Sequence, residues 1–161
     1  MIIYIMEGEI MDINNLVKLI NCIYRCNQVH LDKKLKDLDL TVGTYPYLLR
    51  LSHVEGISQN DISRELSVDK AMSARSIKKL IELGYITKKE NEDDIRAYKL
   101  YLTDKGKEVI PKILNIIGEL LDILLQGSDE KEVEMSMEFL QKVLNNAKEN
   151  RKNCCERVKK T

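Results

Sequence analysis

The sequence lacks an apolar run long enough to cross a membrane as a helix, because Lys, Asn or Glu interrupts each hydrophobic stretch within a few residues. The apolar opening, residues 1–6, has no basic segment before it and is followed by Glu7 and Glu9, so a secretory signal peptide is not expected. Met6 and Met11 are both candidate start sites, and residues 1–11 are expected to be a leader of uncertain extent.

The sequence also has no net charge, since 26 Lys and Arg residues balance 26 Asp and Glu residues. Balance of this kind argues neither for nor against nucleic acid, because phosphate binding depends on local charge. The chain of 161 residues suits one domain with a real core, and its 32% charged and 43% apolar residues describe a soluble, helix-rich protein.

Residues that carry catalysis are scarce. There are two histidines, no Gly-rich phosphate loop, no nucleophile with a nearby base and no zinc-protease spacing, so we expect no enzyme and no cofactor. The cysteines fall at Cys22, Cys26, Cys154 and Cys155, which is not the framework of a secreted disulfide protein, and a reducing cytoplasm is the expected compartment.

The two ends of the chain show helical periodicity. An amphipathic helix is predicted from Asp12 to about His30, a short helix over residues 32–37, and another that starts at Thr41 or Thr44 and reaches His53. Towards the C-terminus, a long helix to Gln126 and a final helix to about Lys148 are separated by the break at Gly127.

The middle of the chain predicts two short helices and a hairpin. Ser58 opens a helix that ends near Leu66, and Asp69 caps a second helix over residues 70–83, which Gly84 terminates. Residues 85–87 and 97–102 are predicted strands that flank a polar turn at residues 90–96.

The second short helix has an outward polar face, which is what a helix-turn-helix presents to DNA. Ile77 and Leu80 point inward. Arg75 has a forked guanidinium group that can hydrogen-bond guanine, and Met72 suits contact with a thymine methyl group. The outward positions, small enough or basic enough for the major groove, are Lys70, Ala71, Ala74, Arg75 and Lys78. Ser58, Gln59 and Asn60, at the start of the first helix, suit phosphate contacts. A solvated charged face is the ordinary interpretation of a single such helix, but the hairpin that follows favours DNA.

From Ile57 to Gly106 the sequence resembles the MarR family of bacterial regulators. The matching segments stand in register with one another: Ile57-Ser58-Gln59, Val68-Asp69, Arg75, Leu80, Gly84-Tyr85-Ile86, Asp94-Ile95-Arg96 and Leu102-Thr103-Asp104-Lys105-Gly106. Ser73 departs from the pattern, since that position is usually apolar in the family. The resemblance implies a mainly α (α+β) fold, a winged helix-turn-helix with N- and C-terminal dimerisation helices.

The resemblance also divides the chain. After the leader it implies an N-terminal dimerisation helix with a short helix (residues 12–40), a DNA-binding region (41–106), C-terminal dimerisation helices (107–149) and a flexible tail (150–161). It assigns Arg96 to the minor groove or to phosphates with Asp94 orienting it, although an exposed salt bridge is the plainer interpretation. Lys88 and Lys89 are candidate phosphate contacts, or lysines that protect an edge strand.

The apolar stripes of the terminal helices need a covering surface, and a second copy of the chain would supply it. A homodimer would place two recognition helices on one face of double-stranded DNA, at half-sites about one helical turn apart. A monomer with a self-contained helical bundle is the alternative.

The family further implies a small-molecule effector, often an aromatic anion, between the dimerisation helices and the winged region. Candidate lining residues are Tyr24, Tyr45, Tyr47 and His53, although aromatics at helical spacing are more often core. Cys22, Cys26 and His30 lie at i, i+4 and i+8, which makes them a weak metal candidate, with two small half-buried cysteines and a helix-end histidine as the plainer interpretation. A peroxide-sensing thiol at Cys26, beside Arg25, is a further weak alternative.

The sequence therefore predicts a ligand-responsive repressor that binds a pseudo-palindromic operator as a homodimer. The alternative is a winged-helix module whose recognition face docks on another protein and does not bind DNA.

Overall fold

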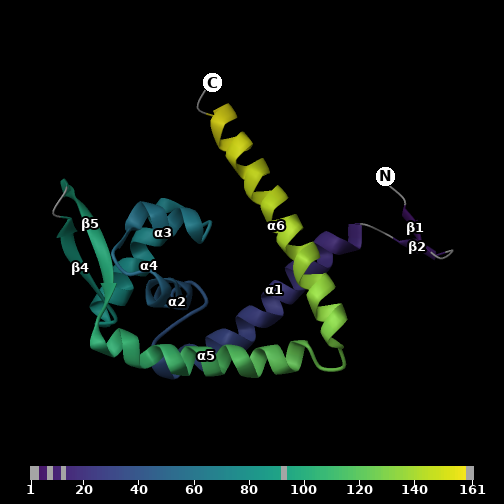
Figure 1. Cartoon of the computed structure of the whole chain (residues 1–161), viewed down its shortest axis with the longest axis horizontal. Helices are drawn as coiled ribbons and strands as arrows, with labels where there is room; N and C mark the ends of the chain where they lie inside the picture. Colours follow the sequence, from purple (N-terminus) through teal and green to yellow (C-terminus); the bar gives the residue numbers. More distant parts are fainter. Residues whose placement is uncertain (1–3, 7–8, 12–13, 92–93, 159–161) are drawn as a thin grey trace. The chain divides into compact units, whose positions relative to one another are not determined.

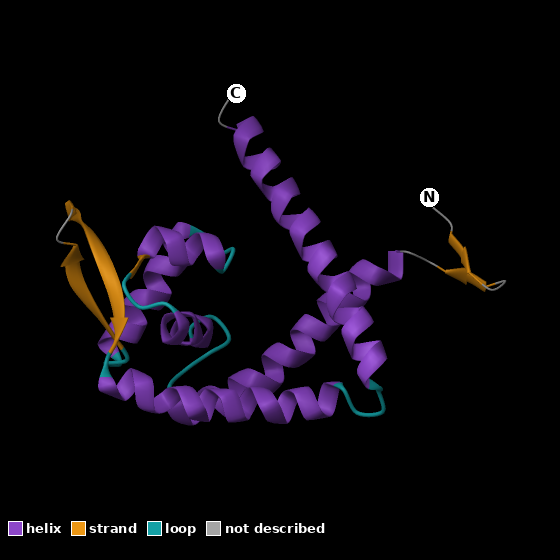
Figure 2. Ribbon diagram, viewed as in Figure 1, coloured by secondary structure: helices purple, strands orange, loops and turns teal. Residues whose placement is uncertain are grey.

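The computed structural model of the chain describes residues 4–6, 9–11, 14–91 and 94–158, with side chains for residues 15–90 and 98–151. The fold is mainly helical with a small antiparallel sheet, as predicted (Figures 1 and 2). In chain order its elements are β1 (Tyr4–Met6), β2 (Glu9–Met11), α1 (Asn14–Leu35), the 3₁₀ helix η1 (Lys36–Leu38), α2 (Tyr45–His53), β3 (Ile57–Ser58), α3 (Gln59–Glu65), α4 (Lys70–Glu82), β4 (Ile86–Asn91), β5 (Asp94–Leu102), α5 (Asp104–Leu124) and α6 (Glu130–Val158).

The chain divides into two units, residues 1–120 and 121–161. The first holds the three-stranded sheet, with strand order β3-β5-β4, and all the helices as far as most of α5. The second holds the end of α5 and α6. Within the described residues, no helix is both long and apolar enough to cross a membrane.

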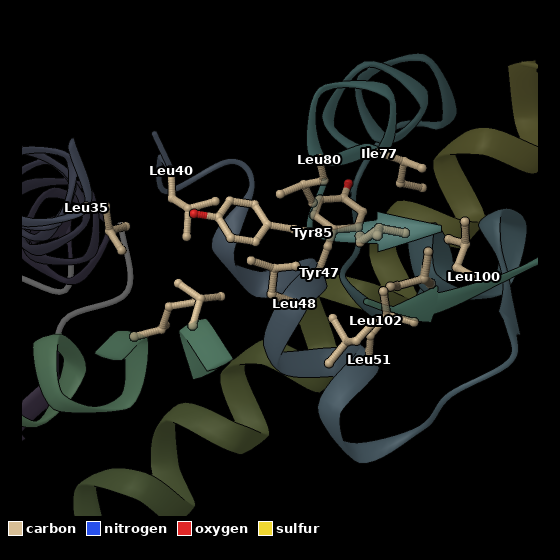
Figure 3. Packing of buried hydrophobic residues seen from close by; sticks show 14 of the residues in the cluster. Leu35, Leu40, Tyr47, Leu48, Leu51, Ile77, Leu80, Tyr85, Leu100 and Leu102 are labelled. Carbon is tan, nitrogen blue, oxygen red and sulfur yellow. The ribbon is translucent and has the colours of Figure 1, made fainter. Parts of the chain in front are cut away.

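The core of the first unit lies between the sheet and the helices α2, α3 and α4. Figure 3 shows side chains of α2, α4 and β5 converging there, with Leu51, Ile77, Leu80 and Leu100 all fully buried. Burial of such a side chain contributes about 1.5–3 kcal/mol to stability. The core thus fixes α4 by its inner face.

The start of the chain's helical part differs from the prediction, because α1 does not end near His30 but continues to Leu35. Leu31 and Leu35 are both buried in the core, so the apolar stripe extends for another turn. Asp32 does not cap a separate short helix: its side chain accepts a hydrogen bond of 2.8 Å from the Val42 backbone N–H. The predicted end of the first helix was wrong because the sequence does not show that the Asp32 side chain bonds to a loop ten residues later.

The wing is larger than predicted. β4 runs to Asn91 and β5 starts at Asp94, where the sequence indicated a polar turn over residues 90–96. A third strand, β3, pairs Ile57 with Leu100 and was not predicted. It has two residues, too few to show an alternating pattern.

The C-terminal helix is also longer than predicted. α6 continues to Val158, and not only to about Lys148, so the segment 150–158, predicted to be a flexible tail, is helical. No glycine or proline occurs between Glu130 and Val158, so the sequence has no residue that would end the helix earlier.

The segment Leu102–Gly106 joins the sheet to α5. The Thr103 hydroxyl accepts a hydrogen bond from the Gly106 N–H (3.0 Å) and donates one to the Gly84 carbonyl (2.6 Å). A Cβ atom at Gly106 would lie 2.2 Å from the Tyr85 carbonyl oxygen, a distance that real Cβ atoms do not show. Thr103 therefore starts α5, and only glycine fits one turn later.

Candidate nucleic-acid interface

The turn between α3 and α4 follows the predicted capping pattern. Ser58 accepts a hydrogen bond from the Asp61 N–H (3.1 Å) and so caps α3. The Asp69 carboxylate caps α4 by accepting from the N–H groups of Ala71 (2.8 Å) and Met72 (3.3 Å). Ser67 has a φ of +56° and reverses the chain between the two helices. These local bonds hold α3 and α4 as a helix-turn-helix.

At the α3 N-terminus the three predicted phosphate contacts differ in availability. The Ser58 hydroxyl is engaged within the cap, since it also donates to the Asp61 carboxylate (2.6 Å), and Gln59 is half-buried. Asn60 is exposed. At the C-terminal end of α3, the Arg50 side chain donates a hydrogen bond to Glu65, which ties α2 to α3 and lowers the pKa of the Glu65 carboxyl.

α4 has two distinct faces. Ser73, Ile77 and Leu80 on the inner face are fully buried. Most of the predicted reading positions lie on the opposite face, where Lys70, Ala71, Met72, Arg75 and Lys78 are exposed and Ala74 is half-buried. Met72 is 54% exposed. The helix therefore presents basic, small and apolar side chains together on an uncovered surface.

The buried Ser73 is the position at which the sequence departs from the family pattern. Its hydroxyl has no hydrogen-bond partner among the described residues. A buried polar group without a partner costs about 1–3 kcal/mol. Ser73→Ala is therefore expected to raise the free energy of unfolding in urea by about 1–2 kcal/mol.

The control is Ser76→Ala, one turn along the same helix at a half-buried position. Both substitutions gain the same helix propensity, so only Ser73→Ala reports on the buried hydroxyl. Equal stabilisation by the two variants would show that Ser73 carries no such cost.

The wing carries its basic residues on both strands. Lys88 and Lys89 of β4 are exposed, with their ammonium groups 5.8 Å from the Tyr98 ring centroid and 4.9 Å from the Tyr101 ring centroid. Lys99 of β5 lies directly opposite Lys89 in the ladder. Sequence reasoning missed Lys99, because only the strand register reveals that it stands beside another lysine. Two like charges at opposed positions destabilise a hairpin.

The predicted pair Asp94 and Arg96 lies in β5, close to the tip of the wing, but both side chains are outside the described residues. The roles of this pair remain predictions from the sequence.

The candidate effector residues are not brought together. Tyr47 is fully buried in the core, Tyr24 and His53 are exposed, and Tyr45 is half-buried, with a pKa raised by that burial. An open pocket of about 430 Å³ lies elsewhere in the first unit, between the end of α1 with η1 and the middle of α5. Its lining residues are Lys34, Asp37, Leu38, Pro111, Lys112, Asn115 and Ile116.

The weak metal candidate has no support in the geometry. Cys22 is half-buried and its sulfur accepts a hydrogen bond from Arg25 (3.5 Å), Cys26 is exposed, and His30 is half-buried. Across the part of the chain that the structure describes, no three His, Cys, Asp or Glu side chains gather as a metal site. The side chains of Cys154 and Cys155 lie outside that part.

Two capped helices with an uncovered polar face, followed by a β-hairpin, define a winged helix-turn-helix protein. Comparison with known proteins places the chain within this class. A model of the MarR family matches residues 38–97. The HTH-type transcriptional regulator YybA of Bacillus subtilis is 34% identical over 133 residues, which cover 83% of this chain and 89% of that regulator.

Two further proteins agree. The HTH-type transcriptional regulator BilQ of Clostridioides difficile is 42% identical over 92 residues, which are 57% of this chain and 62% of BilQ, less than two thirds of its length. The crystal structure of a putative MarR family transcriptional regulator from Listeria monocytogenes, complexed with a 26mer DNA, has 29% identity and a TM-score of 0.79, covering 83% of this chain and 89% of that one. The chain belongs to the MarR family of transcriptional regulators, and not to an enzyme family.

Proposed function

We propose that this regulator binds a pseudo-palindromic operator in double-stranded DNA as a homodimer, with α4 in the major groove and the β4–β5 wing against the neighbouring minor groove. The observation that carries the proposal is the two-faced α4, which is anchored by a fully buried inner face while Arg75, Met72 and Lys78 face outward. The Listeria relative, crystallised with a 26mer DNA, supports the DNA-binding part of the proposal.

The homodimer is inferred from apolar surface that the single chain leaves in water. On α6, Met137, Leu140 and Leu144 follow helical spacing and are exposed. The corresponding large apolar side chains of α1 are Val17, Leu19, Ile20, Ile23, Tyr24 and Val29. Exposed apolar stripes of this kind mark a protein interface, and a second copy of the chain would cover each of them in a symmetric way.

The regulatory part of the proposal is a cytoplasmic repressor whose operator affinity falls when a small aromatic anion binds. It is supported by the pocket beside α5, where Lys34 and Lys112 provide positive charge and Leu38 and Ile116 provide apolar contacts. Lys34 is also bonded to Glu119 (2.8 Å), so an anion would compete with that carboxylate for the ammonium group.

DNA binding is tested with duplexes that the protein selects from a random-sequence pool. The affinity for the selected duplex should fall steeply with salt, with a logarithmic slope of about −0.9 for each phosphate neutralised. If no duplex is retained even at low salt, the protein-docking alternative replaces DNA binding.

Arg75 and Arg96 should affect binding differently. Arg75→Ala is expected to cost about 1–3 kcal/mol on the selected duplex, roughly a 5- to 150-fold loss, and to relax the base preference at one position of each half-site. Arg96→Ala should weaken binding to all sequences and flatten the salt slope by about one unit. Anisotropy titrations on single-base variants at several salt concentrations distinguish these effects. Identical losses for both variants on every sequence would refute this division of roles.

A further inference from the structure

The C-terminal end of α4, called its exit below, is bonded to η1 and α5, two helices assigned to the dimer. Tyr85 directly follows Gly84, whose φ of +75° ends the helix. The Tyr85 hydroxyl donates a hydrogen bond of 3.0 Å to the Leu38 carbonyl of η1, 47 residues away in the sequence. Burial, with a smaller contribution from the Asp39 charge, raises the pKa of the Tyr85 phenol, so the hydroxyl keeps its proton at neutral pH.

Lys105 of α5 makes the second attachment. Its ammonium group donates to the Leu83 carbonyl (2.7 Å) and lies 4.6 Å from the centroid of the Tyr85 ring. The last carbonyls of a helix have no partner within the helix, and the helix dipole places negative charge there. Lys105 thus binds the end of α4 and the face of Tyr85 at the same time.

We propose that Tyr85 and Lys105 are positioning residues for DNA binding, which hold α4 at a fixed angle to η1 and α5 and thereby set the half-site spacing that the dimer accepts. This inference rests on the DNA-binding function proposed above. Neither residue needs to contact DNA, because both act through the orientation of α4.

The length of α4 makes this angle decisive. Its 13 residues span about 20 Å, and the reading residues Lys70 to Arg75 lie at the end opposite the fastened exit. A tilt of about 10° at the exit would move the reading end by roughly 3.5 Å, close to the rise of one base pair. A loosened exit would therefore let each copy of α4 reach a half-site displaced by one base pair.

The test measures tolerance of operator spacing. The duplex selected by the wild-type protein is remade with one base pair added to or removed from its centre, and affinities are measured by anisotropy. For the wild-type protein, the altered centre should lower affinity at least about tenfold. In Tyr85→Phe and in Lys105→Met, that ratio should fall to threefold or less.

Lys107→Met is the matched control, because Lys107 is an exposed lysine two residues further along α5 whose ammonium group pairs with Glu55 (3.6 Å), and it should keep the wild-type ratio. A purely structural role predicts equal losses at all spacings, so wild-type ratios in both Tyr85→Phe and Lys105→Met would overturn the proposal. Equal wild-type affinity for all spacings would also overturn it. In both cases the DNA-binding function stands. If the wild-type protein selects no duplex at all, the proposed DNA-binding function and this inference both fail.

Discussion

Gly106→Ala is expected to destabilise the protein by about 3 kcal/mol or more, a loss typical of overpacking against an element that cannot move. The new methyl group would stand 2.2 Å from the Tyr85 carbonyl oxygen and 3.2 Å from a methyl carbon of Leu102. That carbonyl already accepts a hydrogen bond from the Thr103 N–H (3.0 Å), and the Thr103 hydroxyl lies 3.2 Å from it. Relief of the clash would therefore separate α5 from the end of α4 and break the bond to the Thr103 N–H.

Gly118→Ala provides the comparison on the same helix. Outside the backbone of its own helix turn, no atom of the described residues lies within 4 Å of a Cβ atom placed there, and alanine is the better helix former by about 0.5–1 kcal/mol. Chemical unfolding of the two variants should thus give changes of opposite sign. A Gly106→Ala variant as stable as the wild-type protein would mean that α5 does not pack against Tyr85 as described.

Leu140→Asp is expected to abolish the proposed dimer and with it most of the DNA affinity. Leu140 is 48% exposed on α6, between Met137 and Leu144 of the same stripe. Symmetry would bury the new carboxylate twice in an apolar contact. A monomer binds only one half-site and loses the gain from linked binding, which is about 10²–10⁴. Light scattering reports the mass, and anisotropy reports the affinity for the selected duplex.

Asn145→Asp is the charge-matched control, because residue 145 lies about 140° around α6 from Leu140, among the polar residues Glu138, Lys142 and Glu149, and adds the same negative charge. It should remain a dimer with nearly unchanged affinity. If Leu140→Asp also behaves in this way, the α6 stripe is not the dimer contact, and another apolar surface must hold the two copies together.

The parts of the fold that could be predicted are those fixed by neighbouring residues. Ser58 and Asp69 cap the helices that follow them, and Gly84 ends α4 with a positive φ, as their local sequence indicated. The buried and exposed faces of α4 follow from a single helical period, so most of its reading surface was also predictable.

The parts that could not be predicted depend on residues distant in the sequence. Asp32 looked like a helix start because the sequence does not show that its side chain bonds to Val42, in the loop after η1. Thr44 is a local exception: it precedes α2 as predicted, but its hydroxyl accepts from the Thr41 N–H (2.8 Å) instead of capping the helix. The attachment of Tyr85 to Leu38 has no sequence signature at all, since neither residue type is unusual at its position.

The opposed lysines of the wing, Lys89 and Lys99, give dissolved ions two contrary effects on the same hairpin. Without DNA, added electrolyte shields the ammonium groups from each other and eases formation of the ladder. On the operator, a phosphate can take the place of those small anions, and added electrolyte then competes with it. A high salt concentration consequently stabilises the free wing most and weakens its binding to nucleic acid most.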